Sequence, residues 1–220
     1  MSKESQHYVL DFIKSGLESD GFLHKAGQIY VKNFDKNWRG WIALSSGSSS
    51  ISPRIGVMNL EIHDALYHVL KEVYAAPDNS PKKTNLGPPT VMTLLAELIG
   101  DPGAVSRTAS WSNLNDYPAE TAAKDLMEAI REKGYEFIRS NLTLESLTES
   151  ALHYNKFGHA QQYSTPILLM RLGKVDLLNK FVKPCHDQYD EKFQNMAVLY
   201  KTYINKMAEH LNFDADKIEW

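Results

Sequence analysis

The sequence predicts an α+β protein: an antiparallel sheet of three to five strands with two early helices packed against it, followed by an all-helical C-terminal part. Two observations lead to this fold class. Apolar side chains alternate with a period of two between residues 29 and 57, and they recur at helical spacing before and after that region. We expect residues 1–115 to form the sheet domain and residues 116–220 the helical part. No flexible linker separates the two, so we expect them to pack against each other.

The N-terminal region begins as a helix and continues as strands. Apolar residues at helical spacing predict an amphipathic helix over residues 3–19, which the Asp20-Gly21 pair ends. Residues 29–44 predict a hairpin with a polar turn, and residues 51–57 predict a third strand. Because Pro53 has no amide donor, we expect it at a sheet edge or a bulge.

The clearest helix of the chain follows, together with two less regular segments. Apolar residues from Ile62 to Val73 fit the spacing i, i+3, i+4 and predict the second helix. Residues 76–89 are rich in proline and predict a loop. Residues 90–99 suit either a helix or a strand; the turn signal after them favours a strand, with a returning strand over residues 105–111.

The C-terminal half carries helical patterns throughout. Helix starts are predicted near Pro118, Thr143 and Pro166, and Gly173 is expected to end the third of these helices. After a short helix, Pro184 is expected to begin the last and longest one, about 40 Å long at 1.5 Å per residue.

Charge and composition exclude several classes of protein. The 220 residues have a net charge of −3 at pH 7 and are 43% hydrophobic and 23% charged, as folded soluble proteins are. Nucleic acid binding needs a concentrated basic stripe, and a membrane span needs about 20 apolar residues; the sequence contains neither. We therefore expect no nucleic-acid partner and no membrane partner.

The single cysteine, Cys185, and an N-terminus without a signal-peptide core indicate the cytoplasm. Cys185 continues an apolar helix face, so we interpret it as a small buried hydrophobe rather than as a nucleophile. Neither a phosphate-binding glycine loop nor a His-Glu-x-x-His motif occurs, and no cofactor is expected.

One polar cluster lies on the second predicted helix. Glu61, Asp64 and His68 are three or four residues apart, so they share one stripe of the helix. Two carboxylates and an imidazole are able to hold a divalent metal ion or to act in acid–base catalysis. The alternative is a water-facing stripe in which Asp64 pairs with His68, and the neighbouring Lys71 favours that alternative.

Aromatic residues of the predicted hairpin suggest a surface for a partner. Trp38 and Trp41 fall on opposite faces of the strand, so one of them faces outward unless a helix covers that side. An outward Trp41 with Tyr30 and Arg39 nearby would form a partner-binding patch.

The order of these elements resembles a family. A helix leads into Gly21-Phe22, followed by Lys25, Gly27 and Tyr30, the strand Trp41-Ile42-Ala43-Leu44 and, later, Trp111. This order is similar, over residues 5–150, to a bacterial family defined as a domain of unknown function. Several of its relatives of similar α+β build are thought to be immunity proteins of polymorphic toxin systems. The resemblance implies an α+β fold and a toxin-like protein partner, and it supplies no catalytic residue.

The sequence therefore predicts a non-catalytic cytoplasmic protein that binds another protein, in the manner of an immunity-type inhibitor. Two alternatives stay open. One is a metal-assisted hydrolase that uses Glu61, Asp64 and His68. The other is a protein that binds a small molecule between the sheet part and the helical part.

Overall fold

The chain folds into two compact units, each built from separate stretches of sequence. The computed structural model describes residues 3–73, 88–100, 110–154, 159–192 and 194–220. The sheet unit contains Met1–Val57 and Met92–Leu142, and the helical unit contains Met58–Val91 and Thr143–Trp220. None of the helices formed by the described residues has the length and apolar character needed to cross a membrane.

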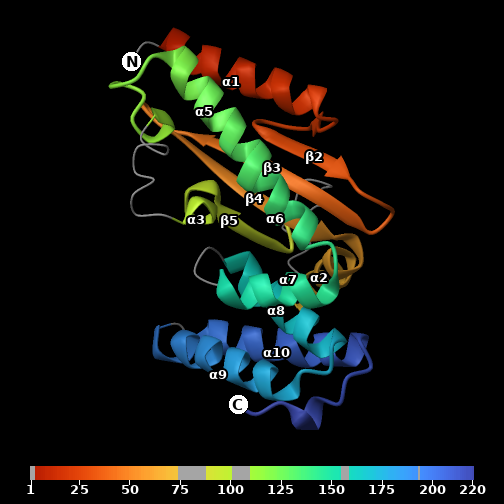
Figure 1. The fold of residues 1–220 in the computed structure, drawn as a ribbon. Coiled ribbons are helices and arrows are strands. Elements are labelled where there is room, and N and C mark those ends of the chain that lie inside the picture. Colours follow the sequence, from red (N-terminus) through yellow and green to blue (C-terminus); the bar gives the residue numbers. More distant parts are fainter. Residues whose placement is uncertain (1–2, 74–87, 101–109, 155–158, 193) are drawn as a thin grey trace. The chain divides into compact units, whose positions relative to one another are not determined.

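A five-stranded antiparallel sheet confirms the predicted fold class (Figure 1). The strands lie in sequence order and are β1 (Leu23–His24), β2 (Ile29–Asn33), β3 (Trp38–Ser46), β4 (Ile51–Asn59) and β5 (Val91–Leu94). In the β2–β3 hairpin, Tyr30 lies opposite Ile42 and Lys32 lies opposite Gly40. Directly paired residues share a face of an antiparallel sheet, so these four side-chain positions lie on one face.

Two long helical segments pack on the sheet of this unit. α1 (Lys3–Ser19) and α5 (Ala119–Ala129) run side by side across one face of the sheet in Figure 1. Their contact is close at Gly16, where a Cβ atom would lie only 2.7 Å from the Sδ atom of Met127. The short helix α3 (Leu95–Ile99) follows β5 directly.

A π-helical segment interrupts the second of these long helices. Residues Ile130–Gly134 form it, and the helix then continues as α6 (Tyr135–Ser140). Glycine allows close approach of this segment to the sheet: a Cβ on Gly134 would lie 3.2 Å from Cδ1 of Ile55, and one on Gly40 would lie 2.9 Å from Cγ2 of Ile138. Single π-helical turns are rare in proteins, and those that occur are often found at functional sites.

The helical unit is built on α2 (Leu60–Val73), which packs against α8 and α10. Its buried residues are Ile62, Ala65 and Val69. The other helices are α7 (Leu144–His153), α8 (His159–Arg171), α9 (Val175–Lys192), α10 (Gln194–His210) and a 3₁₀ turn (Ala215–Lys217).

Aromatic side chains connect the last helices of this unit. Tyr200 and Tyr203 of α10 donate hydrogen bonds to the backbone carbonyls of Gln162 and Tyr163 in α8. Trp220 contacts α9 and α10: its ring lies 5.4 Å from the ring of His186 and 4.8 Å from Nζ of Lys201.

Several predicted elements are confirmed, and others differ. The helix over residues 3–19, the hairpin and the end of α8 at Gly173, whose φ is +64°, are as predicted. Residues 90–99 divide into a strand and a helix, β5 and α3. Of the returning strand predicted over residues 105–111, only residues 110 and 111 are described, and they are helical. The loop predicted over residues 76–89 lies largely outside the described residues.

Two predicted helix starts at prolines were wrong. α8 begins at His159 and contains Pro166 in its interior. Pro184 lies inside α9, which ends at Lys192, and the last long helix, α10, begins at Gln194. An internal proline costs a helix about 3 kcal/mol, and burial of Phe181 and Val182 in α9 opposes that cost. Pro53 lies in β4, which is between β3 and β5 in the sheet, and its placement at an edge position or a bulge stays a prediction. β5 is four residues long and pairs with only part of the nine-residue β4.

The chain does not divide into its two compact units at residue 115, where the sequence predicted the boundary. α5 and α6 belong to the sheet unit because α5 packs against α1. α2 belongs to the helical unit, where it packs against α8 and α10. The long helices of the sheet unit are therefore α1 and α5 rather than α1 and α2.

Candidate functional site

The candidate site begins at the C-terminal end of α1. The amide of Gly21 donates to the carbonyl of Glu18, and the amide of Phe22 donates to the carbonyl of Leu17. This pair of bonds is a Schellman motif, and it requires the left-handed conformation of Gly21, whose φ is +84°. The motif places Asp20 at the helix end and returns Phe22 towards the core, where it is buried.

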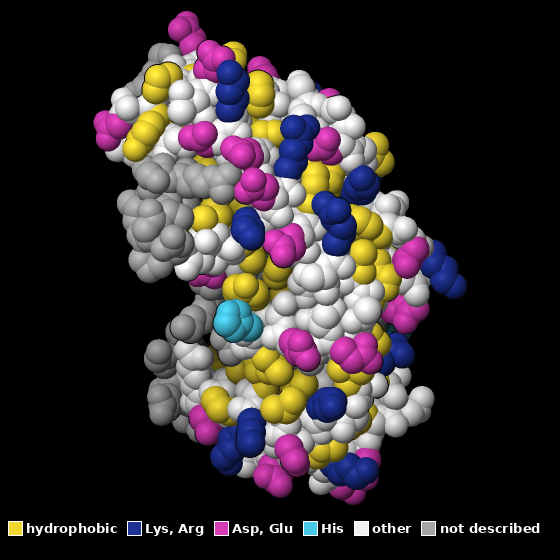
Figure 2. All heavy atoms as spheres, in the orientation of Figure 1, with side chains coloured by type: hydrophobic (Ala, Val, Ile, Leu, Met, Phe, Trp, Pro, Cys, Tyr) yellow, Lys and Arg dark blue, Asp and Glu magenta, His cyan; other side chains and the backbone are white. Residues whose placement is uncertain are grey.

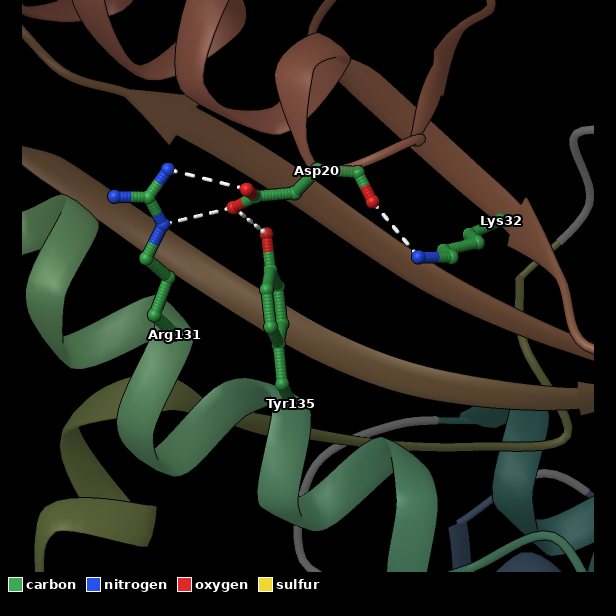
Figure 3. Close-up of polar contacts among 4 residues, drawn as sticks. All are labelled: Asp20, Lys32, Arg131 and Tyr135. Carbon is green, nitrogen blue, oxygen red and sulfur yellow. Dashed lines mark hydrogen bonds and ion pairs between the residues drawn. The ribbon is translucent and has the colours of Figure 1, made fainter.

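Asp20 joins two segments that are far apart in the sequence (Figure 3). Arg131 binds its carboxylate with two bonds, Nε to Oδ2 at 2.8 Å and Nη2 to Oδ1 at 3.1 Å. The hydroxyl of Tyr135 donates to Oδ2 at 2.8 Å. The backbone carbonyl of Asp20 accepts a hydrogen bond of 2.7 Å from Nζ of Lys32. We name these four residues the Asp20 network.

The π-helical segment and the residue after it supply two of the network's donors. Arg131 lies within it and Tyr135 follows it, and both reach the same carboxylate from one helix (Figure 3). The ring of Tyr135 also stacks on the ring of Phe22, with centroids 5.3 Å apart. The helix is therefore attached to the end of α1 by both polar and aromatic contacts.

The protonation states of the network follow from these contacts. The hydrogen bond from Arg131, together with the one from Tyr135, holds the pKa of Asp20 below its ordinary value of 3.8, although partial burial opposes the shift. Burial and the neighbouring carboxylate raise the pKa of Tyr135 above its ordinary value of 10.0. At neutral pH, Asp20 is thus an anion and Tyr135 a neutral phenol that donates its proton to the hydrogen bond.

A pocket of about 330 Å³ opens beside the network. Its lining residues come from the end of α1, from β2 and the turn after it, and from one face of α6: Asp20, Phe22, Lys32, Phe34, Tyr135, Ile138 and Arg139. Phe22 and Ile138 are buried, whereas Phe34 and Arg139 are exposed. The pocket thus has an apolar floor and a rim with an aromatic ring and a guanidinium.

Lys32 and Arg139 are two cations that line the pocket. Lys32 donates to a backbone carbonyl and lies 5.8 Å from the centre of the Phe22 ring. Nε of Arg139 donates to the carbonyl of Tyr135. Within the described part of the chain, neither residue forms an ion pair with a carboxylate. Figure 2 shows basic and hydrophobic side chains next to one another over β2 and α6.

The predicted metal-binding residues lie on α2, in the helical unit. Glu61, Asp64 and His68 are all exposed. Nε2 of His68 lies 3.1 Å from Oε1 of Glu72, and its ring lies 5.1 Å from the ring of His210. Among the described residues, no group of three His, Cys, Asp or Glu side chains is placed to hold a metal ion. The metal site stays a prediction, without a converging set of donors in the described geometry.

The predicted partner-binding patch does not face solvent. Tyr30 and Trp41 are only 1% and 6% exposed, so the premise that Trp41 points outward was wrong. Arg39 is partly exposed, and its Nε donates to Oδ1 of Asn33 at 2.8 Å. Tyr30 pairs with Ile42, and Trp41 pairs with Val31. Because neighbouring residues of a strand point to opposite faces, Tyr30 and Trp41 lie on opposite faces of the sheet. Both are buried, so both faces are covered there.

Cys185 is partly buried, and its thiol interacts with Tyr200. Burial raises the pKa of this thiol, which reduces the fraction of reactive thiolate. The neighbouring His186 pairs instead with Asp187, at 3.4 Å. These contacts agree with the interpretation of Cys185 as a structural residue.

Sequence reasoning interpreted Asp20 only as part of a helix stop and missed the pocket. One signal was present: a carboxylate at a helix C-terminus opposes the helix dipole, which favours cations there. An acidic residue in that position indicates a compensating cation elsewhere. The partner, Arg131, is 111 residues away and could not be identified by spacing.

Comparison of the chain with models of known protein families, with curated proteins and with solved structures gives no match.

Proposed function

We propose that this chain is a small-molecule-binding protein and that its ligand occupies the pocket beside the Asp20 network. One observation carries the proposal: Lys32 and Arg139, which form no ion pair with a carboxylate among the described residues, line the same pocket as three aromatic rings. Ligand sites have volumes of about 300–1,000 Å³ and combine apolar walls with a few polar groups. The pocket of about 330 Å³ fits the lower end of that range.

The chemistry of the network supports binding rather than catalysis. A general base needs a pKa near the working pH. Asp20 has a lowered pKa and already accepts hydrogen bonds from Arg131 and Tyr135, so it is a weak base at neutral pH. Tyr135 has a raised pKa and is a weak acid. The network holds the pocket's walls in place.

The proposal is tested by nuclear magnetic resonance with a fragment library that contains neutral, cationic and anionic compounds. We expect some fragments to cause saturable shifts in the amides of β2 and α6. Lys32→Gln should weaken that binding, and Lys36→Gln, which changes an exposed lysine in the neighbouring turn, should not. A library that produces no saturable shift in this pocket would count against the proposed function.

Protein binding is the second candidate, and one observation favours it. Tyr8 and Phe12 lie on one face of α1, with ring centroids 6.5 Å apart, and are 46% and 37% exposed. Aromatic residues are enriched at the centres of protein interfaces. An exposed aromatic pair on a helix is therefore a contact point for a protein partner, including the toxin-like partner that the sequence predicted.

This candidate is tested by affinity purification from the cells in which the protein occurs. We expect a stoichiometric partner that is retained by the wild type and lost with the double variant Tyr8→Ser/Phe12→Ser. The control, Leu177→Ser/Val198→Ser, changes two exposed apolar residues of the helical unit and should retain the partner. Equal recovery with both double variants would exclude this face of α1 as the contact.

A further inference from the structure

We infer that the ligand of the pocket is a small aromatic anion, with its carboxylate or phosphate at Lys32 and Arg139 and its ring against the aromatic wall. This inference rests on the proposed function and names the chemical class of the ligand. It follows from three features of the pocket: its charge, its aromatic residues and its size.

The charge of the pocket favours an anion. Arg131 and Asp20 compensate each other in a two-bond ion pair, so neither is available to a ligand. Lys32 and Arg139 add two further positive charges, and neither forms an ion pair with a carboxylate among the described residues, although Lys32 is near enough to Asp20 to help lower the pKa of that carboxyl. The bond from Nε of Arg139 to a carbonyl leaves the terminal nitrogens of its guanidinium, which form charge-assisted hydrogen bonds with carboxylates and phosphates.

The same geometry disfavours a cationic ligand. The carboxylate of Asp20 is the one acidic group that lines the described pocket, and it already accepts bonds from Arg131 and Tyr135. A ligand cation would have to replace one of these bonds and would meet repulsion from Lys32 and Arg139.

The aromatic residues favour a ring as the body of the ligand. Phe22 and Tyr135 stack with centroids 5.3 Å apart and form a continuous aromatic wall. Phe34 lies at the rim and is 38% exposed. Aromatic pairs gain attraction beyond the area that they bury. A ligand ring lying against the wall would also remove part of Phe34 from water, which is favourable for an apolar surface.

The size of the pocket limits the ligand. About 330 Å³ is near the smallest volume found for ligand sites, so a single ring with one anionic group fits better than a large cofactor. Carboxylate and phosphate share the required charge and hydrogen-bond acceptors, and the experiment separates them.

The test measures the affinity of the 220-residue chain for five compounds by calorimetry and by amide chemical shifts. Benzoate and phenyl phosphate carry both a ring and a charge; benzamide has the ring without the charge; acetate and inorganic phosphate have the charge without the ring. We expect removal of the charge or of the ring to weaken binding by about tenfold or more. Added salt should weaken binding of the charged compounds.

Two variants identify the site. Arg139→Gln and Lys32→Gln should each weaken binding of benzoate or phenyl phosphate by about tenfold. Arg139 is exposed at the end of α6, so its replacement leaves the fold intact if the loss of Lys32 proves disruptive. The matched control is Arg171→Gln, at the exposed end of α8 in the helical unit, which should bind like the wild type.

Each outcome has a distinct meaning. Tighter binding of phenyl phosphate than of benzoate assigns the phosphate class, and the reverse order assigns the carboxylate class. Equal binding of benzamide and benzoate in the pocket would overturn the inference about charge while leaving the proposed function standing. Equal binding of acetate and benzoate would overturn the role of the ring. If none of the five compounds binds but neutral fragments do, the aromatic-anion class is wrong.

Discussion

Asp20 occupies a position that a helix alone would not favour. The last carbonyls of a helix carry partial negative charge, and a carboxylate beside them is destabilising. The Schellman bonds to Gly21 and Phe22 satisfy those carbonyls without help from the Asp20 side chain. Its carboxylate is instead stabilised by Arg131 and Tyr135. Asp20 thus stabilises the contact between α1 and the π-helical segment, and it does not stabilise α1 itself.

The variant Asp20→Asn tests this account through pH. Because the folded state lowers the pKa of Asp20, its stabilising effect is present above the ordinary value of 3.8 and is lost as the pH falls through the lower, folded value. Arg131 is 50% exposed, so we expect the variant to lose about 1 kcal/mol or less at pH 7. Urea unfolding at pH 7, 5 and 3 measures the difference from wild type, which should shrink towards pH 3.

The matched control for this experiment is Asp11→Asn, on the exposed face of α1. No ion pair of Asp11 occurs within the described residues, so this substitution should change stability little. An Asp20→Asn difference that stayed constant from pH 7 to pH 3 would contradict the assignment of the carboxylate as the stabilising group.

At the level of elements, glycine residues set how closely the second long helix approaches the sheet. Gly40 on β3 faces Ile138 of α6, and Gly134 of the π-helical segment faces Ile55 of β4. These two positions hold the helix near the strands and thereby bring Tyr135 to the end of α1. Ile138 and Phe34, which contact the Gly40 position, also line the pocket.

The substitution Gly40→Ala should therefore affect both stability and the pocket. The added Cβ would lie 2.9 Å from Cγ2 of Ile138 and 3.0 Å from Cε2 of Phe34, so both side chains must move. Overpacking of this kind costs about 1–3 kcal/mol. Urea unfolding measures the cost, and fragment binding reports the change in the pocket.

Repeating Gly40→Ala in an Ile138→Ala protein tests whether contact with Ile138 causes the loss of stability. In an Ile138→Ala protein, the new methyl group has space, so Gly40→Ala should cost less there than in the wild type. Equal costs in the two backgrounds would show that contact with Ile138 is not the cause.

Local elements could be predicted from the sequence because they depend on nearby residues. The apolar spacing of α1 and the alternation in the β2–β3 hairpin report which side chains are buried, and Gly173 marks a left-handed helix end. The course of α9 through Pro184 could not be predicted, because tertiary packing outweighs the local cost of the proline. The pocket could not be predicted either, since it depends on the pairing of Asp20 with Arg131 across most of the chain.

At the level of the whole molecule, the chain passes between its two units three times. It leaves the sheet unit after Val57, returns after Val91 and leaves again after Leu142. α2 therefore lies between two strands in sequence although its packing partners, α8 and α10, come from the far end of the chain. Neither unit is a continuous piece that could be removed by a single cut.

A fragment of residues 1–142 should consequently be less well folded than the same residues in the full chain. It would retain α2 without α8 and α10, which would expose Ile62, Ala65 and Val69. Binding of a hydrophobic dye measures this exposure. Replacing α2 in the fragment by a flexible Gly/Ser linker should reduce dye binding, and unchanged binding would show that the exposed surface lies elsewhere.

The position of Trp220 has a practical consequence. Of the four tryptophans in the sequence, Trp38, Trp41 and Trp111 belong to the sheet unit, and Trp220 alone belongs to the helical unit. A protein in which phenylalanine replaces the other three would have a single fluorophore, held between His186 and Lys201. Its emission during denaturation would follow the separation of α9 from α10 alone, so the melting of one half of the protein becomes visible without any added label.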